Sequence, residues 1–207
     1  MSITQEPLLR FGLADVEVRS QVRKYQGFFA LDEYQFRHKL YAGGYSKVLT
    51  REVFERGNAV GLLPYDPKND TVVLIEQFRA GALQSKTGPW QLELIAGMFS
   101  ENEVPQDVAI REANIDLAPE NVIKVMDYLS SAGGMTECIH LYCACVDSEN
   151  ISGIFGLASE GEDILVHVIS RKNAEKLLAE GKILNAATII TLQWLALNID
   201  KFKSNWK

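Results

Sequence analysis

The segment Gly97–Pro119, GMFSENEVPQDVAIREANIDLAP, decides how the rest of the chain is interpreted. It follows a strand-like apolar run and opens with a short acidic loop. A helix is predicted to begin at Pro105, because proline suits the first helical position. We expect this helix to include Glu112 and Asp116, which are four residues apart, so that both carboxylates project from one face, one turn apart. Such a pair suits a hard divalent cation such as Mg²⁺, which takes its remaining ligands from water or phosphate oxygens.

Neighbouring features favour a metal site over the ordinary alternative, in which these carboxylates belong to a solvated helix face. The preceding strand ends at a glycine, so the backbone carbonyl of Ala96 could reach the same ion. Arg111 could pair with Glu103 and hold the acidic loop against the helix. Further along the chain, Glu160 and Glu162 lie in a polar, glycine-containing loop that could fold over the site.

The composition limits the classes of partner. At 207 residues the chain has room for one large domain, or for one domain with a smaller appendage, and an apolar content of 47% is enough for a sizeable core. The formal net charge of −6 argues against a nucleic-acid backbone or an anionic membrane as the main partner. A small phosphorylated ligand stays compatible with this charge, because a few arginines and a metal ion can reverse the field at one site.

The three cysteines, Cys138, Cys143 and Cys145, form neither a CxxC pair nor a zinc-binding set. Alternation along their strand places Cys143 and Cys145 on one face, which predicts buried, reduced thiols and a cytoplasmic protein. The N-terminus lacks the basic start and apolar core of a secretory signal. No apolar run approaches the ~18 residues that span a bilayer, so no membrane partner is expected.

The N-terminal part of the chain is predicted to form a small antiparallel sheet. Two glycine-containing turns separate three segments with partial alternation, which are Val16–Tyr25, Phe28–Leu40 and Tyr45–Phe54. A sheet with so little apolar mass would be marginally stable alone. We therefore expect it to pack on the remainder of the chain or on a second subunit.

The remainder of the chain is predicted to arrange strands and helices around a central sheet. The turn Asp66–Asp70 should join two apolar strands into a hairpin, and Asn185 should cap a long C-terminal helix. The predicted strands are Ala59–Tyr65, Thr71–Gln77, Trp90–Ala96, Val122–Ser130, Cys138–Val146 and Ile164–Ile169, and the later helices are Ala174–Glu180 and Ala186–Phe202. This mixture predicts an α/β (α+β) fold with α/β/α layering and an appended N-terminal sheet.

The spacing within Gly97–Pro119 resembles the Nudix box, Gly-x5-Glu-x7-Arg-Glu-apolar-x-Glu-Glu-x-Gly-apolar. The matching positions are Gly97, Glu103, Arg111, Glu112 and Ala113. The closing positions differ, because the box there has two glutamates, a glycine and an apolar residue and this chain has Ile115, Asp116, Ala118 and Pro119. The box is therefore recognisable but degenerate at its catalytic end.

Outside the box, the chain resembles bacterial ADP-ribose pyrophosphatases of the Nudix hydrolase superfamily over nearly its full length. The resemblance is carried by GFFALDEYQFRHKL (27–40), REVFERGNAVGLLPYDP (51–67), VVLIEQFRAGA (72–82), PWQLELIAGM (89–98), GLASEGEDILVHV (156–168) and NAATIITLQWL (185–195). It implies the Nudix fold, a mixed β-sheet sandwiched between helices, with an N-terminal antiparallel sheet exchanged in a homodimer. Residues 1–55 would then be a dimerisation region, and residues 56–207 the Nudix hydrolase domain.

The resemblance also implies an activity. A hydrolase of this family would cleave the diphosphate of ADP-ribose, or of a related nucleotide sugar, to AMP and a sugar phosphate, with Mg²⁺ or Mn²⁺ as cofactor. Ile115 and the altered end of the box leave an alternative open, a catalytically impaired homologue that binds a nucleotide ligand without efficient hydrolysis. A nucleic-acid-binding or structural module is a third class, which the acidic charge disfavours.

Finally, the resemblance implies a role for each candidate site residue. The catalytic residues would be Glu112, Arg111 and Glu160, the last as the base that activates water. Metal would be held by Glu112, Asp116, Glu162 and the carbonyl of Ala96. The substrate would be bound by Phe28, which stacks on the adenine from the partner subunit, by Arg51 and Arg79, which face the diphosphate, and by Met98 and Glu137. Forked guanidinium groups match phosphate oxygens in pairs, which makes arginine a suitable residue type for the diphosphate contacts.

Overall fold

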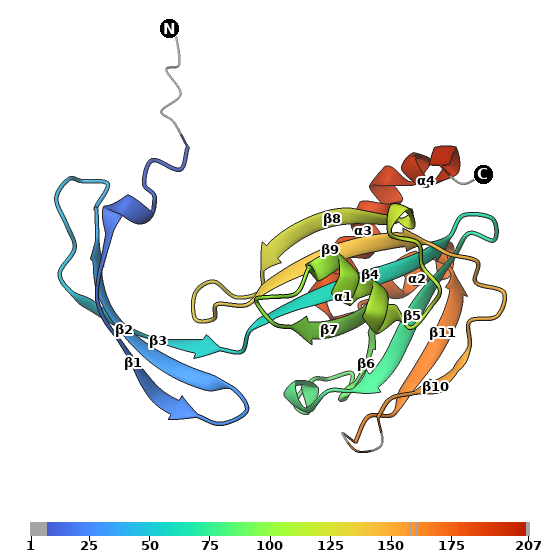
Figure 1. Cartoon of the computed structure of the whole chain (residues 1–207), viewed down its shortest axis with the longest axis horizontal. Helices are drawn as coiled ribbons and strands as arrows, with labels where there is room; N and C mark the ends of the chain where they lie inside the picture. Colours follow the sequence, from blue (N-terminus) through green and yellow to red (C-terminus); the bar gives the residue numbers. More distant parts are fainter. Residues whose placement is uncertain (1–7, 158, 160, 206–207) are drawn as a thin grey trace, which may run out of the picture. The chain divides into compact units, whose positions relative to one another are not determined.

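The structure is a computed structural model that describes residues 8–157, 159 and 161–205. The described chain separates into two compact units, whose elements are labelled in Figure 1. The first unit contains the residues up to Arg56 together with Ser131–Glu137, and the second contains Gly57–Ser130 and the residues from Cys138 onward. The functional division into a dimerisation region and a catalytic domain stays a prediction.

The first unit is an antiparallel sheet with the order β1-β2-β3, whose strands are β1 (Val16–Gln26), β2 (Ala30–His38) and β3 (Leu49–Glu55). A short 3-10 helix, η1 (Leu13–Asp15), precedes β1. The segment Ser131–Glu137 joins the sheet beside β3, where the Phe54 N–H donates to the Gly134 carbonyl at 2.8 Å. Along β1 the apolar side chains of Val18, Val22 and Tyr25 are exposed. The antiparallel N-terminal sheet predicted from the sequence is therefore present, and it buries little apolar surface of its own.

Within the described residues, the second unit holds an eight-stranded mixed sheet. Its path is β10-β11-β5-β4-β9-β8, with β6 paired to β5 and β7 paired to β4, and only the β4–β9 pair is parallel. The strands are β4 (Asn58–Asp66), β5 (Thr71–Phe78), β6 (Trp90–Glu93), β7 (Ile95–Phe99), β8 (Val122–Leu129), β9 (Cys138–Cys145), β10 (Gly153–Phe155) and β11 (Ile164–Ser170).

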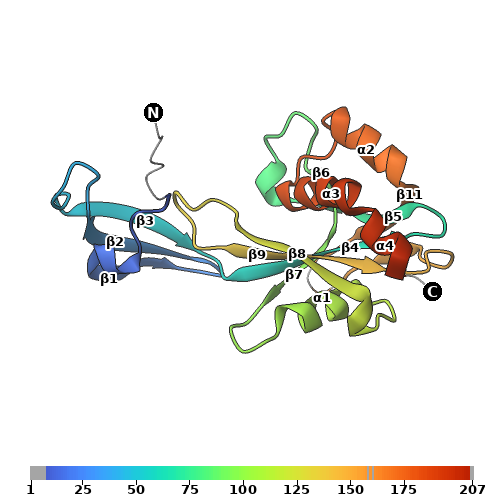
Figure 2. The ribbon, with the colours of Figure 1, turned by 90° about the horizontal axis from the view of Figure 1, so that it is seen from above.

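Helices cover both faces of this sheet. Figure 2 shows α1 on one face and α2, α3 and α4 on the other. The helices are α1 (Pro105–Ala113), α2 (Arg171–Ala179), α3 (Ala186–Asn198) and α4 (Asp200–Asn205), with short 3-10 turns η2 (Ala80–Ala82) and η3 (Pro119–Asn121). The mixed sheet between helices that the sequence predicts is confirmed. None of the described helices has the length and hydropathy that crossing a membrane requires.

Alternation along β4 divides the core between the two faces. Val60 and Leu62 pack with α1 residues such as Val108, whereas Leu63 and Tyr65 pack in a second cluster with residues of α2 and α3. Each of these four β4 side chains is at most 2% exposed. Burial of one such side chain contributes roughly 1.5–3 kcal/mol, so the two clusters fix the position of α1 and of the C-terminal helices on the sheet.

Two local signals in the sequence are confirmed. Asn185 caps α3, because its Oδ1 accepts the Thr188 N–H at 3.0 Å. The turn after β4 is closed by Asp66, whose Oδ1 accepts the backbone N–H groups of Lys68 and Asn69. Burial by itself would raise the pKa of Asp66, but the hydrogen bonds from Ser148 and Asn69 outweigh burial and lower the pKa to about 2. Asp66 is therefore ionised and tightly held, as a turn-closing acceptor should be.

The cysteines also lie as expected. Cys143 and Cys145 are buried in the core between the sheet and the C-terminal helices, and all three cysteines are free thiols. Burial raises the pKa of the Cys143 thiol well above its ordinary value, and it raises the pKa of Cys145 to about 11. Because the thiolate is the reactive form, these two residues are inert packing groups.

Other boundaries were predicted wrongly. The strand Trp90–Ala96 is interrupted at Leu94, where the chain passes from pairing with β5 to pairing with β4. The backbone N–H of Leu94 donates instead to the Thr188 hydroxyl at 2.9 Å, so the break leaves no buried donor unpaired. The long helix Ala186–Phe202 is two helices that meet at Ile199. The short strand β10 was not predicted.

The most consequential error concerns α1, which does begin at Pro105 but ends at Ala113. Asn114 adopts a left-handed conformation (φ 49°, ψ 35°) and terminates the helix. Asn tolerates this conformation better than most residues, which makes it a recognised helix stop. Asp116 therefore lies outside the helix, and the prediction that it shares a helical face with Glu112 is wrong.

Candidate active site

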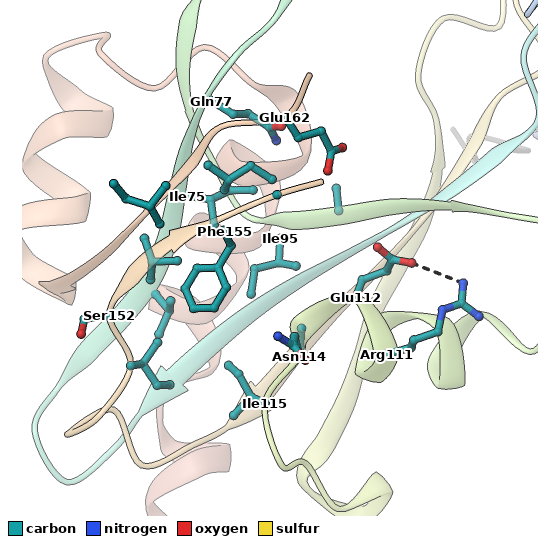
Figure 3. Close-up of a pocket in the computed structure, with 18 of the residues that line it drawn as sticks. Ile75, Gln77, Ile95, Arg111, Glu112, Asn114, Ile115, Ser152, Phe155 and Glu162 are labelled. Atoms are coloured by element: carbon teal, nitrogen blue, oxygen red, sulfur yellow. Dashed lines mark hydrogen bonds and ion pairs between the residues drawn. The ribbon is translucent and has the colours of Figure 1, made fainter. Parts of the chain in front are cut away.

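A pocket of about 950 Å³ lies in the second unit, on the side of the sheet that carries α1. Its walls come from β5, β7, the end of α1, the segment after β9, and β11. The lining is apolar over much of its area, with Ile75, Ile95, Ile115 and Phe155 among its residues. Figure 3 shows the carboxylate of Glu162 and that of Glu112 toward one side of this pocket, with Ile115 and Ser152 toward the other. The volume is within the range of pockets that bind small molecules, roughly 300–1,000 Å³.

Glu112 reaches the pocket from the last turn of α1. Its carboxylate lies directly against the backbone of β7, because a Cβ built at Gly97 would lie 2.4 Å from the Glu112 Cδ and 2.6 Å from its Oε2. Only glycine permits this close approach, and the glycine is the first residue of the box. The neighbouring Ala96 also lines the pocket, so the structure brings together Glu112 and the backbone that the sequence predicted as its metal-binding partner.

Glu162 enters the same pocket from the segment before β11. Its Oε2 accepts the Leu157 N–H at 3.3 Å, and its own N–H donates to the Leu157 carbonyl at 3.2 Å. Gly156 has a φ of +114°, and a Cβ there would lie 2.7 Å from the Glu162 carbonyl oxygen. A glycine is thus required where the two ends of this loop meet.

The fit of these groups to a divalent cation is uneven. Glu112, Glu162 and the Ala96 carbonyl offer hard oxygen ligands in one pocket, which suits a cation that completes its shell with water and phosphate. Among the described residues, however, no three His, Cys, Asp or Glu side chains lie close enough to form a metal-binding group. Asp116 is exposed and is not part of the pocket lining. The predicted base, Glu160, lies outside the described residues.

Ile115 stands at the sequence position where a complete box has a glutamate. It lines the pocket and packs against the apolar cluster that holds α1, together with Ile95 and Ile151. The Ile115 side chain therefore contacts the apolar core and also forms part of the pocket wall.

The predicted contact between Arg111 and Glu103 is confirmed. Arg111 Nη1 donates to Glu103 Oε1 at 2.5 Å, and Arg111 Nη2 donates to Glu112 Oε1 at 3.3 Å, the contact drawn in Figure 3. Glu103 also accepts the backbone N–H and the hydroxyl of Ser100. Arg111 thus ties the acidic loop to the carboxylate that faces the pocket. The hydrogen bonds from the Ser100 N–H, Arg111 and the Ser100 hydroxyl lower the pKa of Glu103 to about 2.

This lowered pKa predicts an acid-sensitive loop. Because the pKa of Glu103 is lower in the folded chain than its ordinary value of 4.5, its contribution to stability is complete above about pH 4.5 and is lost as the pH falls toward about 2. We expect the melting temperatures of the wild-type protein and of Glu103→Gln to differ near neutral pH and to converge as the pH approaches 2. A constant difference across this range would contradict the contact.

Arg79 lines the pocket just after the end of β5, and its role as a diphosphate-binding arginine stays a prediction. Its Nη2 lies 2.9 Å from Oε2 of Glu93, a carboxylate that is 4% exposed and that sequence reasoning missed. A signal was available, because Glu93 stands inside a strand-like apolar run, and a buried charge must be paired.

The other predicted substrate-binding residues are not among the residues that line this pocket. Met98 lies on β7 and is 42% exposed. Phe28, Arg51 and Glu137 belong to the first unit, where Phe28 is exposed and Glu137 is buried beside Arg56, with the Arg56 Nε 3.2 Å from its carboxylate. Their roles stay predictions.

Comparisons with known proteins place the chain in a family. A protein of Haemophilus influenzae named ADP-ribose pyrophosphatase is 45% identical over 202 residues, which cover 95% of this chain and 93% of the relative. A protein of Escherichia coli K12 with the same name is 48% identical over 198 residues, which cover 95% of each chain. The chain belongs to the ADP-ribose pyrophosphatase family of Nudix hydrolases. A more distant relative in Shigella dysenteriae, named GDP-mannose pyrophosphatase, is 34% identical over 72% of this chain and 78% of its own length.

The family is not detected by every comparison. No protein-family model matches the chain. A crystal structure of an ADP compounds hydrolase superimposes with a TM-score of 0.65 at 15% sequence identity, over 93% of this chain and 98% of that one. At this level of identity the superposition supports the fold alone, and it agrees with the mixed sheet between helices described above.

Proposed function

We propose that the protein hydrolyses the diphosphate linkage of ADP-ribose or a related nucleotide sugar and releases AMP and a sugar phosphate. The observation that carries this proposal is that Glu112, Glu162 and Arg79 line one pocket of a chain in this family. Relatives named for ADP-ribose and for GDP-mannose support a nucleoside diphosphate linked to a sugar as the substrate class.

The residues of the pocket suit this reaction. A diphosphate resists hydrolysis because its negative oxygens repel an incoming nucleophile, and the guanidinium of Arg79 offsets part of that charge. Glu112, Glu162 and the Ala96 carbonyl would hold Mg²⁺ or Mn²⁺, which supplies further neutralisation and lowers the pKa of bound water. The substrate would contribute phosphate oxygens to the cation's shell, which is consistent with the finding that no three His, Cys, Asp or Glu side chains of the described residues form a metal-binding group by themselves. The proposed base is Glu160, and Asp116 would be at most an outer ligand.

The proposed assembly is a homodimer in the cytoplasm. The exposed apolar side chains of β1 support a partner surface on the first unit, because Val18, Val22 and Tyr25 would otherwise face water. Exchange of this sheet between subunits would make Phe28 and Arg51 of one chain available to the partner's substrate. The free thiols support a reducing compartment.

A turnover assay tests the proposal. Purified protein incubated with ADP-ribose and millimolar Mn²⁺ or Mg²⁺ should release AMP and ribose 5-phosphate, measured by ion-exchange chromatography. Chelation of the divalent cation should reduce the rate to background, and re-addition should restore it. An absence of AMP at high protein concentration, with ADP-ribose, other ADP-sugars and GDP-mannose, would contradict the proposal.

A further inference from the structure

The buried carboxylate of Glu93 accepts hydrogen bonds from two pocket-lining residues, Gln77 and Arg79, and from Asn185. Oε2 of Glu93 accepts Arg79 Nε at 3.0 Å and Gln77 Nε2 at 3.3 Å, and it also lies 2.9 Å from Arg79 Nη2. Oε1 accepts Asn185 Nδ2 at 3.1 Å. A buried ionised group is costly unless it is paired and hydrogen-bonded, and Glu93 meets both conditions.

We infer that Glu93 and Asn185 are positioning residues that fix the guanidinium of Arg79 at the pocket wall and thereby set the affinity of the site for the diphosphate of its substrate. This inference rests on the proposed function. Neither residue lines the pocket, so both act through Arg79 and not by touching the substrate.

The geometry of the ion pair supports this role. Glu93 contacts one edge of the guanidinium, Nε and Nη2, so that among the described residues the Nη1 edge is left for a phosphate oxygen. The Arg79 side chain is 44% exposed, which means that it reaches from a buried anchor toward solvent in the pocket. A long side chain without such an anchor loses more conformational entropy when it binds a ligand, and a pre-ordered one loses less.

Asn185 fixes the carboxylate in turn. Its Oδ1 accepts the N–H of Thr188 at 3.0 Å and the hydroxyl of Thr188 at 3.0 Å, while its Nδ2 donates to Glu93. The same Thr188 hydroxyl accepts the backbone N–H of Leu94, the residue after Glu93. The start of α3 therefore holds both the side chain of Glu93 and the backbone beside it.

A purely structural role for this network is the competing explanation. Tying α3 to the sheet requires only the contacts of Asn185 and Thr188 with residues 93 and 94. It does not require the contact between Arg79 and Glu93. The effect of that contact is to orient a charged group in the pocket. The two explanations differ in what they predict for the Michaelis constant.

Steady-state kinetics with ADP-ribose separate them. Glu93→Gln keeps the shape of the side chain and removes its charge. We expect KM to rise by about tenfold or more, while kcat changes by less than about threefold. The reason is that a hydrogen bond to a charged group changes a binding equilibrium constant by about tenfold to a hundredfold. Asn185→Ser keeps an N-cap oxygen and removes the amide donor, and it should raise KM by a smaller factor. In an Arg79→Ala background, Glu93→Gln should raise KM no further.

A matched control is available on the neighbouring strand. Glu76 is a half-exposed carboxylate on β5 that contacts His167 at 2.8 Å and is absent from the pocket lining, so Glu76→Gln should leave KM and kcat unchanged. An independent readout is the ¹⁵N–¹H signal of Arg79 Nε, which should lose its protection from solvent exchange in Glu93→Gln and retain it in Glu76→Gln.

The nuclear magnetic resonance readout does not depend on turnover, so it tests the ion pair even if ADP-ribose proves not to be a substrate. The inference is overturned if Glu93→Gln lowers thermal stability but leaves KM unchanged, or if it raises KM equally in the Arg79→Ala background. Should Glu93→Gln fail to fold, Asn185→Ser decides the question by the same criteria.

Discussion

Glu112→Gln is expected to remove nearly all hydrolysis of ADP-ribose while the protein stays folded. The substitution keeps the size of the side chain but removes the charge of one of the three described carboxylates that line the pocket, which are Glu112, Asp147 and Glu162. Loss of outer-shell partners alone typically reduces the activity of a metal site by about ten- to a hundredfold, so loss of Glu112, which we propose as a direct ligand, should reduce kcat by at least about a hundredfold. The Glu112 side chain is about one-third exposed, and its replacement leaves no cavity, so the melting temperature should change little.

The measurement compares initial rates of AMP release with those of a matched variant. Glu101→Gln makes the same chemical change at an exposed position of the acidic loop that precedes α1, and it should retain wild-type activity. Wild-type rates in Glu112→Gln would show that the box carboxylate is not required. In that case the degenerate end of the box would have to be explained by a different catalytic site.

Local chemistry explains which parts of the fold were predictable. The start of α1 at Pro105, the cap at Asn185 and the turn after β4 each depend on one residue's backbone preference or hydrogen bond, and all three are confirmed. The strand order and the contacts of Glu93 depend on segments far apart in the sequence. Glu93 receives donors from residues 77, 79 and 185, and no local pattern in the sequence links these positions.

The end of α1 shows how a tertiary contact overrides a family pattern. The start at Pro105 and the four-residue spacing of Glu112 and Asp116 predicted helix through Asp116, but Ile115 packs with Ile95 and Ile151 against the apolar cluster that holds α1. An apolar residue at this position gains by burial, roughly 1.5–3 kcal/mol if complete, and the left-handed Asn114 turns the chain so that the burial can occur. Asn114 could have been recognised as a helix stop, whereas the apolar surroundings of position 115 could not. The candidate site consequently lacks Asp116 among the described residues that line it.

Gly97→Ala is expected to reduce hydrolysis by about ten- to a hundredfold without reducing stability. A Cβ at this position would lie 2.4–2.6 Å from the Glu112 Cδ, Cγ and Oε2, which is far inside contact distance. Because the obstructing atoms belong to the end of a flexible, one-third exposed side chain, Glu112 can swing away at little energetic cost. Restricting the unfolded chain by replacing glycine with alanine typically stabilises a compatible site by about 0.4–1 kcal/mol, so the melting temperature should be unchanged or slightly higher. The substitution therefore displaces the Glu112 carboxylate without removing it.

Gly61→Ala on the facing strand β4 provides the contrast. Its Cβ would lie 2.7 Å from Leu94 Cδ1 and 3.0 Å from Leu141 Cδ2, both in the buried core, so overpacking should cost about 1–3 kcal/mol of stability while the folded enzyme keeps its rate. Comparing the two variants thus distinguishes an effect on the geometry of the site from an effect on packing in the core. If Gly97→Ala lowered the melting temperature as Gly61→Ala does and left kcat intact, the close approach of Glu112 to the β7 backbone would have a structural role only. Loss of activity at unchanged stability in Gly97→Ala, combined with the reverse in Gly61→Ala, would instead establish that this glycine is present in the box to admit the Glu112 carboxylate.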